Sequence, residues 1–261
     1  MAKDDYTIRS IHRGFSVLQA INRSGSMRLM DISKSTQLPY PTVSRIVETL
    51  VELGMVERES SGRRYRPTAL VQTLSAGYQE EHALVSCARP HIVKLCNKVG
   101  WPITITTRVG NRMMVRDSTH RLTTLTFNNY APGYTLPLLE CSVGKVYLAF
   151  CGEEERISII SSLEKLDDKV DQMAKLLLRD DDVLLDDIRT KGYAYHAYNQ
   201  HTENPGKTSS LAVPVFLDGK LAGGLGLIFF SSSMSVAEAA EKYVDEMRET
   251  AELIGKSGSS S

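Results

Sequence analysis

The chain has few of the residues that would tie it to metals, disulfides or membranes. Its 261 residues include four cysteines without a C-x-x-C pair and six histidines without the spacing of metal ligands. A long uncharged stretch, Leu221 to Ala237, is broken by glycines and serines and is too short for a membrane span. The first residues, MAKDD, lack the apolar run of a signal peptide. These absences predict a cytoplasmic protein with free thiols, without a metal or other cofactor and without a membrane partner.

The net charge is zero, yet the charge is divided unevenly along the chain. Residues 1–68 hold 11 Lys and Arg against 7 Asp and Glu, and the remaining residues hold 20 against 24. A basic segment favours binding to nucleic acid, because neutralising phosphates supplies most of the sequence-independent affinity for DNA. A composition of 42% apolar and 24% charged residues over this length predicts two globular domains.

Residues 29–66 show the pattern of a winged helix-turn-helix, in which two short helices and a tight turn are followed by a basic hairpin. Pro39 and Pro41 mark the start of the second helix and Gly54 marks its end. Alternation in residues 55–59, a turn at 60–62 and a basic run at 63–66 predict the hairpin. The second helix itself is predicted by an apolar stripe at three- and four-residue spacing, formed by Val43, Ile46, Val47, Leu50 and Leu53.

A recognition helix of this kind enters the major groove with its N-terminal residues against base edges, and a basic hairpin binds phosphates or the adjacent minor groove. We therefore predict double-stranded DNA as a partner, with Arg45 as the principal base reader. The alternative is a structural pair of helices with a solvated hairpin, which the basic excess disfavours. The predicted DNA-binding residues are Tyr40, Thr42, Ser44, Arg45, Thr49, Arg63, Arg64 and Arg66.

The sequence predicts four segments. Residues 1–68 form the DNA-binding domain, residues 69–99 a linker, residues 100–255 a mixed α/β domain, and residues 256–261 a flexible tail. The linker is expected to be a helix, a bend at Pro90 and a second helix, and to contribute to a homodimer or homotetramer. Pairing is expected because one winged module covers few base pairs, whereas two-fold symmetry lets two modules read a palindromic or repeated site.

Beyond Trp101 the pattern changes to short strands and helices. Asp218-Gly219 separates two apolar runs and predicts a tight hairpin. The predicted strands are residues 103–109, 112–117, 123–128, 211–217 and 220–230, and the predicted helices are residues 136–151, 153–163, 181–191 and 236–254.

In this order the elements resemble those of the IclR family of bacterial transcription regulators, along essentially the whole chain. The resemblance is carried by SIHRGFSVLQAI, by LPYPTVSRIVETLVELGMVER with RYR, and by LPLLECSVGKVYLAF and SSLAVPVFLDGKLAGGLGL. Within the family, VGWPITITTRVGNRMMVRDSTHRLTTLTF followed by LPLL is most similar to the MhpR-type activators of phenylpropionate catabolism. The resemblance implies an α+β fold with a winged helix-turn-helix, a linker helix and a C-terminal GAF-like α/β domain. That domain would bind a small organic acid and change how a dimer or tetramer sits on its operator, without catalysis.

Two departures from the family pattern are expected to matter. The turn between the two short helices usually holds glycine, and Gln37 here is expected to strain or reshape it. Relatives that sense small oxo-acids use an acid, a cysteine and serines around the last strands, where this chain has Gln200, Ser210, Gly226 and Ile228. This less polar set predicts a larger, aromatic effector such as a phenylpropionate or hydroxybenzoate, and a glyoxylate- or pyruvate-like oxo-acid is the alternative.

A carboxylate needs well-placed donors and an aromatic ring needs apolar walls, so the candidate effector residues combine both near strand ends and the buried helix. Each has a competing explanation as a loop, core or close-packing residue. The candidates are Arg116, Thr119, His120, Arg121, Tyr130, Leu138, Ser142, Gly144, Tyr195, Ser209 and Ser210.

Fragments of catalytic motifs are present, but none is complete. S-x-x-K occurs at residues 142–145 without its companion motifs. G-K-T at residues 206–208 ends like a phosphate-binding loop, yet His201 stands where glycine is required. G-L-G at residues 224–226 would need glycine in place of Phe229 for a dinucleotide site. The sequence therefore predicts a regulator and not an enzyme, and a DNA-binding oligomer without a ligand is a second alternative.

Overall fold

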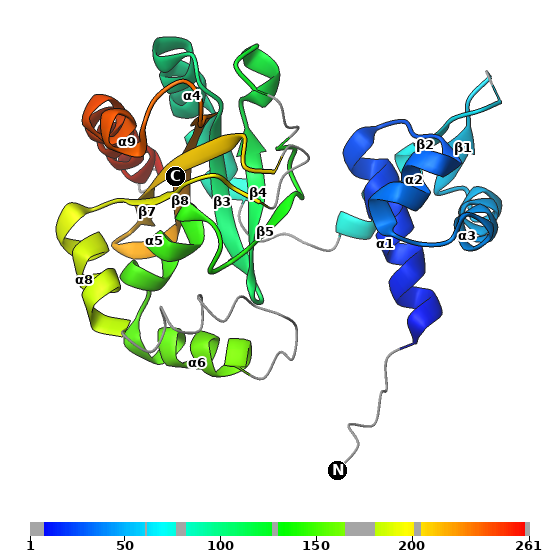
Figure 1. The fold of residues 1–261 in the computed structure, drawn as a ribbon, viewed down its shortest axis with the longest axis horizontal. Helices are drawn as coiled ribbons and strands as arrows, with labels where there is room; N and C mark the ends of the chain where they lie inside the picture. Colours follow the sequence, from blue (N-terminus) through cyan, green and yellow to red (C-terminus); the bar gives the residue numbers. More distant parts are fainter. Residues whose placement is uncertain are drawn as a thin grey trace. The chain divides into compact units, whose positions relative to one another are not determined.

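The computed structural model describes residues 8–60, 62–76, 82–126, 130–164, 181–200 and 205–258. The chain divides into two compact units, residues 1–80 and residues 81–261 (Figure 1). Each unit has its own hydrophobic core. The two units are therefore described separately.

The first unit contains three helices and a two-stranded hairpin, in the order expected for a winged helix-turn-helix. Its core is closed by fully buried side chains from all three helices, among them Ile21, Ile32 and Val47. The prediction of two short helices followed by a hairpin is confirmed, although Ser61 of the expected wing turn lies outside the described residues. The elements are α1 (Arg9–Ser24), α2 (Leu29–Thr36), α3 (Tyr40–Glu52), β1 (Val56–Arg58), β2 (Tyr65–Pro67) and the 3₁₀ helix η1 (Ala69–Ser75).

The turn between α2 and α3 keeps its shape despite the missing glycine. Gln37 adopts φ 56° and ψ 25°, the left-handed conformation that glycine enters most easily. The Ser33 hydroxyl donates a hydrogen bond of 2.6 Å to the carbonyl of Leu38 and closes the turn. The expected strain is therefore present in the backbone of Gln37, and it does not change the arrangement of the helices.

The second unit is built on an antiparallel six-stranded sheet in the order β5-β4-β3-β8-β7-β6. Its strands are β3 (Ile103–Val109), β4 (Arg112–Ser118), β5 (Thr135–Pro137), β6 (Ala194–His196), β7 (Thr208–Leu217) and β8 (Lys220–Phe230). The helices are α4 (His82–Val99), η2 (His120–Leu122), α5 (Ser142–Phe150), α6 (Glu153–Glu164), α8 (Asp181–Lys191) and α9 (Val236–Gly258). One hydrophobic core joins α4 and α9 to the sheet, and a second core joins α5, α6 and α8 to the opposite face (Figure 1).

The β7–β8 hairpin confirms the tight turn predicted at Asp218-Gly219. Both residues have positive φ, 49° and 75°, as a two-residue hairpin turn of the primed type requires. The helices predicted near residues 153–163, 181–191 and 236–254 are also present. The elements predicted correctly are therefore those with a long hydrophobic pattern or with a turn that requires particular residues.

Other elements differ from the prediction. Pro90 lies inside α4, which continues through it as one helix and not as two. The burial of Ala88 and Ile92 against the core outweighs the one backbone hydrogen bond that proline removes. Residues 69–75 form a 3₁₀ helix and not an α-helix. Residues 123–126 are not a strand, and residues 127–128 of that prediction lie outside the described residues.

The ends of two predicted helices are also corrected. The helix expected from residue 136 begins at Ser142, because residues 135–137 pair with β4 as an edge strand. The last helix extends to Gly258 and not into a tail from residue 256. Its final turn is fastened by the Ser257 hydroxyl, which donates to the carbonyl of Leu253 and lies 3.0 Å from Nε2 of His91.

Candidate functional site

The exposed face of α3 carries the residues that the sequence predicts for DNA reading. Val43, Val47 and Leu50 hold the opposite face in the core. Arg45 is exposed and Tyr40 is 45% exposed. This orientation leaves the N-terminal part of α3 open to a partner, as the prediction requires.

Three further residues of α3 that were predicted to read bases are less accessible to DNA. Thr42 and Ser44 are half-buried at the border of the helix face. Thr49 is exposed, but its hydroxyl donates to the carbonyl of Arg45 at 3.0 Å. A hydroxyl engaged with its own helix backbone is less available to a base edge.

A hollow of about 540 Å³ separates α3 from the N-terminal half of α1. Arg13 from α1 lines it together with Arg45 and Thr42 from α3. Glu48 and Glu52 lie on the same face of α3 as Arg45, so this helix has no net positive charge. Arg13 is therefore a source of positive charge beside α3 that the sequence analysis missed, since nothing in the pattern of α1 distinguishes it from the other basic residues there.

The arginines of the wing have different roles. Nε of Arg64 donates to the Ser26 hydroxyl at 3.0 Å, and the Ser26 hydroxyl donates to Glu59 at 2.6 Å. A second N–H of Arg64 donates to the carbonyl of Ser26. Arg64 thus fastens the wing to the segment between α1 and α2, and only its remaining N–H groups could bind a phosphate.

The neighbouring wing arginines are more accessible. Arg66 lies directly opposite Glu57 across the β1–β2 pair and forms an exposed ion pair with it at 2.5 Å. Arg63 is exposed, and the structure gives it no hydrogen bond to any other described residue. Of the three predicted wing arginines, Arg63 is the one best placed for a phosphate.

A small, partly open cavity lies between α5 and the sheet of the second unit. Its volume is about 20 Å³, which is room for about one water molecule. Four residues of the predicted effector set, Tyr130, Ser142, Ser209 and Ser210, line it. The remaining lining residues are Thr104, Thr106, Val115, Leu136, Cys141, Val143, Asn199, Thr208, Gly226 and Ile228.

The lining is richer in hydroxyl groups than the sequence analysis expected. Ser210, Gly226 and Ile228 lie where the comparison with oxo-acid sensors placed them, but Asn199 lines the cavity in place of its neighbour Gln200. The expectation of a pocket less polar than that of the oxo-acid sensors stays a prediction. Sequence analysis missed Thr104, Thr106 and Thr208, because threonine is also an ordinary residue of buried strands.

Hydrogen bonds satisfy most of these hydroxyls. The hydroxyls of Ser142 and Ser210 are 2.8 Å apart and join α5 to β7. The Thr106 hydroxyl donates to the carbonyl of Gly224 at 3.1 Å. Thr208 is 2% exposed, and its hydroxyl has no hydrogen-bond partner among the described residues. A buried hydroxyl without a partner carries a desolvation cost that a polar ligand would remove.

The N-terminus of α5 opens on the same cavity. Cys141 is the N-cap residue and gives no side-chain hydrogen bond to the first turn, and Ser142 and Val143 line the cavity. The first-turn N–H groups of a helix lack helical acceptors and favour an anion. Burial raises the pKa of the Cys141 thiol to about 12, so the thiol stays neutral and does not compete as an anion.

Gly144 shapes the cavity indirectly. A Cβ atom at this position would lie 1.8 Å from the carbonyl oxygen of Leu138, so only glycine allows the two segments to pack. Leu138 itself is buried in the core. Of the predicted set, Gly144 and Leu138 are therefore a close-packed pair beside the cavity and not part of its lining.

The other predicted effector residues do not reach the cavity. The Thr119 hydroxyl accepts a hydrogen bond from the N–H of Ile103, and Nδ1 of His120 lies 3.1 Å from the Ser118 hydroxyl. Arg121 is exposed. Thr119 and His120 therefore fasten local structure, and Arg116 and Arg121 are not among the residues that line the cavity.

Tyr195 also lies outside the cavity. Its ring is 50% exposed, with Nζ of Lys145 5.8 Å from the ring centroid. Nζ of Lys145 also donates to the carbonyl of Tyr195 at 3.1 Å, and burial lowers the pKa of this lysine. Tyr195 therefore covers the lysine stem and is not a wall of the cavity.

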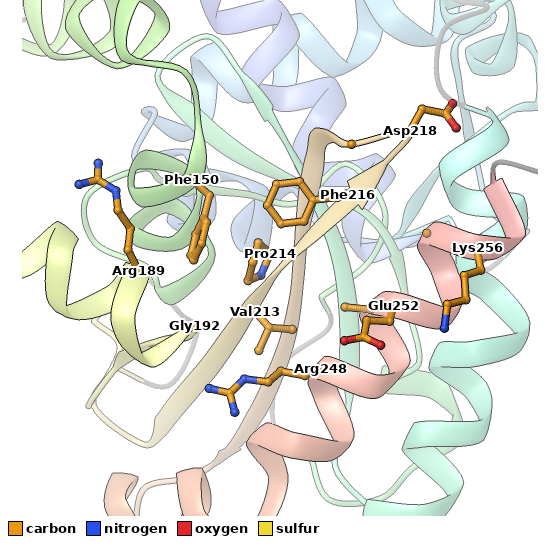
Figure 2. A pocket seen from close by; sticks show the side chains of 13 residues that line it. Phe150, Arg189, Gly192, Val213, Pro214, Phe216, Asp218, Arg248, Glu252 and Lys256 are labelled. Atoms are coloured by element: carbon orange, nitrogen blue, oxygen red, sulfur yellow. The ribbon is translucent and has the colours of Figure 1, made fainter.

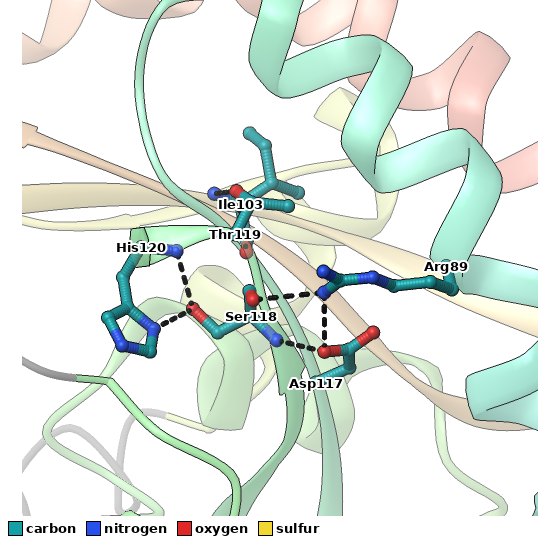
Figure 3. A network of polar contacts seen from close by, with 6 residues as sticks. All are labelled: Arg89, Ile103, Asp117, Ser118, Thr119 and His120. Atoms are coloured by element: carbon teal, nitrogen blue, oxygen red, sulfur yellow. Dashed lines mark hydrogen bonds and ion pairs between the residues drawn. The ribbon is translucent and has the colours of Figure 1, made fainter. Parts of the chain in front are cut away.

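A polar network fastens α4 to the end of β4 (Figure 3). Nη1 of Arg89 donates to Asp117 at 2.9 Å and to the carbonyl of Ser118 at 3.2 Å. Asp117 also accepts from the N–H of Ser118 at 2.7 Å. Ser118 pairs with Thr104 in the sheet, and Thr104 lines the cavity. The network therefore reaches from α4 to within one strand pair of the cavity wall.

Two kinds of site are not found in the part of the chain that the structure describes. No group of three or more His, Cys, Asp and Glu side chains there could hold a metal ion. None of the helices there combines the length and the apolar character needed to cross a membrane. The four cysteines are free thiols, with Cys87 half-buried and the others buried.

Two family models match the chain. The model described as the IclR helix-turn-helix domain matches residues 10–60. The model described as the bacterial transcriptional regulator IclR C-terminal matches residues 76–256, which is more than half of the chain. Both matches coincide with elements described above.

Curated relatives and solved structures agree with these models. The HTH-type transcriptional regulator TsaQ1/TsaQ2 of Comamonas testosteroni is 26% identical over 160 residues, which cover 60% of this chain and 57% of that protein. The HTH-type transcriptional regulator BhcR of Paracoccus denitrificans is 24% identical over 234 residues, covering 87% and 79%. A crystal structure of an IclR homologue from Microbacterium hydrocarbonoxydans, in complex with 4-hydroxybenzoate, is 21% identical, with a TM-score of 0.65 and 97% and 100% coverage. This last likeness confirms the predicted fold class.

Proposed function

The chain belongs to the IclR family of bacterial transcriptional regulators, and we propose that it binds operator DNA in response to a small organic acid. The family is one of regulators and not of enzymes, as the sequence predicts. The observation that carries the proposal is the cavity at the N-terminus of α5. Hydroxyl groups line it, and among the described residues the Thr208 hydroxyl has no hydrogen-bond partner. A regulator of this kind works where the chromosome is, so we place it in the cytoplasm.

The acid would enter with its carboxylate at the N-terminus of α5. No Lys, Arg or His lines the cavity among the described residues, so the backbone N–H groups of the first turn and the Ser142 and Ser210 hydroxyls would supply the donors. The Thr208 hydroxyl would gain a partner on binding. Among the described residues that line the cavity, the unsatisfied Thr208 hydroxyl is what favours a ligand over the ligand-free oligomer.

An aromatic acid is the first candidate for the effector, as in the MhpR-type interpretation of the sequence. Tyr130, Val115, Leu136 and Ile228 provide apolar walls for a ring. A fold relative binds 4-hydroxybenzoate, which supports this class by analogy alone. A ring needs far more than 20 Å³, so the walls would have to separate when it binds. A regulator with such an effector would control an operon for the catabolism of aromatic acids.

A compact oxo-acid is the second candidate, and the cavity itself favours it. A glyoxylate- or pyruvate-like molecule needs less expansion of a 20 Å³ space than a phenylpropionate does. Its carboxylate and oxo group could both be bound by the hydroxyls of Thr104, Thr106 and Ser210. The two classes differ in size and in the need for apolar walls, so binding measurements separate them.

We propose that the cavity acts on DNA binding through α4. This helix is the first element of the second unit, and it follows the winged unit in the chain. Arg89 ties it to Asp117 and Ser118, one strand pair from cavity residue Thr104 (Figure 3). A ligand that moves the β3–β4 pair would therefore move α4 and change the spacing of two winged modules in a dimer or tetramer.

The test is thermal unfolding of the purified chain against a panel of acids: phenylpropionates, hydroxybenzoates, pyruvate and glyoxylate. A ligand that binds only the folded state must raise the melting temperature. A shift with aromatic acids alone supports the first class, and a shift with oxo-acids alone supports the second. No shift with any acid, together with intact operator binding, would leave a DNA-binding oligomer without an effector.

A further inference from the structure

A second and much larger cavity lies at the free edge of β7 (Figure 2). Its volume is about 710 Å³, and it shares no lining residue with the cavity at α5. Strand β6 pairs only with residues 210–212 of β7, so from Val213 onward β7 has no neighbouring strand on that side in the described residues. The cavity fills this gap between α9 on one side and α5 and α8 on the other.

The floor of the cavity is aromatic and apolar. Phe150 at the end of α5 and Phe216 on β7 meet edge to face, with ring centroids 6.1 Å apart and an interplanar angle of 83°. Phe216, near the end of β7, is a large apolar side chain that is 38% exposed. Val213, Pro214 and Ala251 complete the apolar surface. An exposed aromatic pair in a concave site offers ring-stacking surface to a planar ligand.

The rim carries three cations. Arg189 is fixed by a 2.7 Å hydrogen bond from its Nε to the carbonyl of Ala149. Arg248 pairs with Asp245 at 2.8 Å and also donates to the carbonyl of Lys191. Each guanidinium has five N–H donors, so these contacts orient the side chain and leave donors for a ligand.

Two acids balance the rim only in part. Lys256, Arg189 and Arg248 face the cavity together with Asp218 and Glu252, an excess of one positive charge among the lining residues. Glu252 lies four residues from both Arg248 and Lys256 on α9, and it is therefore flanked by cations on the same helix face. Arg189 and Arg248 also pair with Asp186 and Asp245, which lie outside the lining. The attraction for an anion therefore rests on the guanidinium N–H groups that these pairs leave unused, and not on an excess of charge.

The backbone at this edge is unsuited to an added strand. Pro214 has no N–H to donate to a neighbour. Helix α9 covers the next part of the edge, since a Cβ atom at Gly255 would lie 2.8 Å from the carbonyl oxygen of Phe216. An extended peptide would thus find few partners here, whereas a compact molecule needs only the side chains.

We propose that this cavity, which we call the edge site, binds a small aromatic monocarboxylate. The ring would lie on Phe150 and Phe216, and the carboxylate would be bound by the cations of the α9 and α8 walls. A volume of about 710 Å³ is within the range of small-molecule sites and accepts such a ligand without expansion. The edge site does not depend on the effector cavity, so either can exist without the other.

The test uses the full chain and benzoate and 3-phenylpropionate as probes. Isothermal titration gives the number of molecules bound, and amide NMR shifts give their location. Phe216→Ser should weaken binding at the edge site roughly tenfold, because it removes the aromatic contact. Val109→Ser, at a 50% exposed position at the end of β3, is the matched control and should leave binding unchanged.

The variant Gly226→Ala distinguishes the edge site from the cavity at α5. A Cβ atom there would lie 2.7 Å from the Thr104 hydroxyl, so this variant closes the space at α5 and leaves the edge site open. Probe binding that survives Gly226→Ala, shifts the amides of Phe216 and Ala251, and is lost in Phe216→Ser supports the edge site. Binding that is lost in Gly226→Ala and unaffected by Phe216→Ser overturns it and leaves the effector cavity.

Two other outcomes also overturn the edge site. One is the absence of any probe binding at millimolar concentration. The other is a change in oligomeric state, but not in probe binding, when Phe216→Ser is compared with the unmodified chain by sedimentation. The second result would mean that another copy of the chain covers Phe216.

Discussion

The Ser142 hydroxyl, in the first turn of α5, lies 2.8 Å from the Ser210 hydroxyl on β7. The two residues are 68 positions apart in the chain, and both are buried. The two hydroxyls are hydrogen-bonded to each other in the ligand-free chain. An entering carboxylate would therefore have to replace this hydrogen bond with one to each hydroxyl.

We expect Ser142→Ala and Ser210→Ala each to weaken binding of the effector acid by roughly tenfold, since each removes a hydrogen bond to a charged group. The double variant should be only slightly weaker than either single one, because the hydroxyls act as a pair. Titration calorimetry gives the three affinities. Ser162→Ala on α6, which removes an exposed hydroxyl bonded to Asn111, is the control. Fully additive losses would contradict the paired role.

Thr208→Val tests the unsatisfied hydroxyl. The substitution keeps the side-chain shape and removes a buried polar atom that has no partner in the described residues. We expect the free energy of unfolding of the ligand-free chain to rise by about 1 kcal/mol and the affinity for the acid to fall. Chemical denaturation with and without ligand measures both. A purely structural threonine would not move the two quantities in opposite directions.

The arginines of the winged unit should separate by role in operator binding. Arg45→Ala should abolish specific binding and leave folding intact, and Arg45→Lys should recover little, since lysine lacks the bidentate geometry for a guanine edge. Gel-shift titration against operator and scrambled DNA measures the difference. Unchanged discrimination between the two DNAs in Arg45→Ala would show that another residue reads the bases.

The same assay distinguishes the two wing arginines. Arg63→Ala should reduce the slope of log affinity against log salt by about 0.9 at unchanged stability, as expected for one lost phosphate contact. Arg64→Ala should instead lower the melting temperature of the winged unit, because it frees the Ser26 segment from the wing. An Arg64→Ala chain with unchanged melting and a reduced salt slope would restore the phosphate contact that the sequence predicts.

Arg89→Ala tests the route through α4. We expect the affinity for the acid to change by less than about threefold and the effect of the acid on operator affinity to be largely lost, where such couplings amount to about 1–3 kcal/mol. The matched control is Lys98→Ala, which removes an exposed ion pair between the same helix and Glu246. Equal coupling in the Arg89 variant and the unmodified chain would exclude this network as the route.

Gln37→Gly should stabilise the winged unit by about 0.5–1 kcal/mol, because glycine adopts the left-handed conformation without strain. The same exchange at exposed Gln19, inside α1, should destabilise it by about 1 kcal/mol. Urea unfolding of both variants gives the two signs. A loss of stability in Gln37→Gly would mean that the glutamine side chain contributes more than its backbone costs.

The sequence predicted elements whose information is local. The Asp218-Gly219 turn requires positive φ at two adjacent residues, and the apolar stripe of α3 is long enough to define a helix. The three-residue strands β5 and β6 were not predicted, since they are defined by pairing with β4 and β7 and not by a pattern of their own. Pro90 was misinterpreted because core packing, which the sequence does not display, decides whether a helix tolerates proline.

The site was predicted less completely for a similar reason. Ser142 and Ser210 were predicted because hydroxyl donors near the buried helix and a strand end suit a carboxylate, whereas Thr208 belongs to a strand in which threonine is unremarkable by composition. The sequence gives the charge of Arg64 but not its partner, because Ser26 is 38 residues away. Residues that meet across the sheet therefore required the structure.

The separate core of the winged unit has a genetic consequence. Its buried residues, from Val17 to Tyr65, include none from the second unit. A chain whose α3 is damaged would therefore still fold its second unit. In the proposed dimer or tetramer it would still join partners through that unit. In a cell that carries both alleles, such a chain would occupy places in mixed assemblies without holding DNA, and missense alleles in α3 should be dominant-negative where null alleles are recessive.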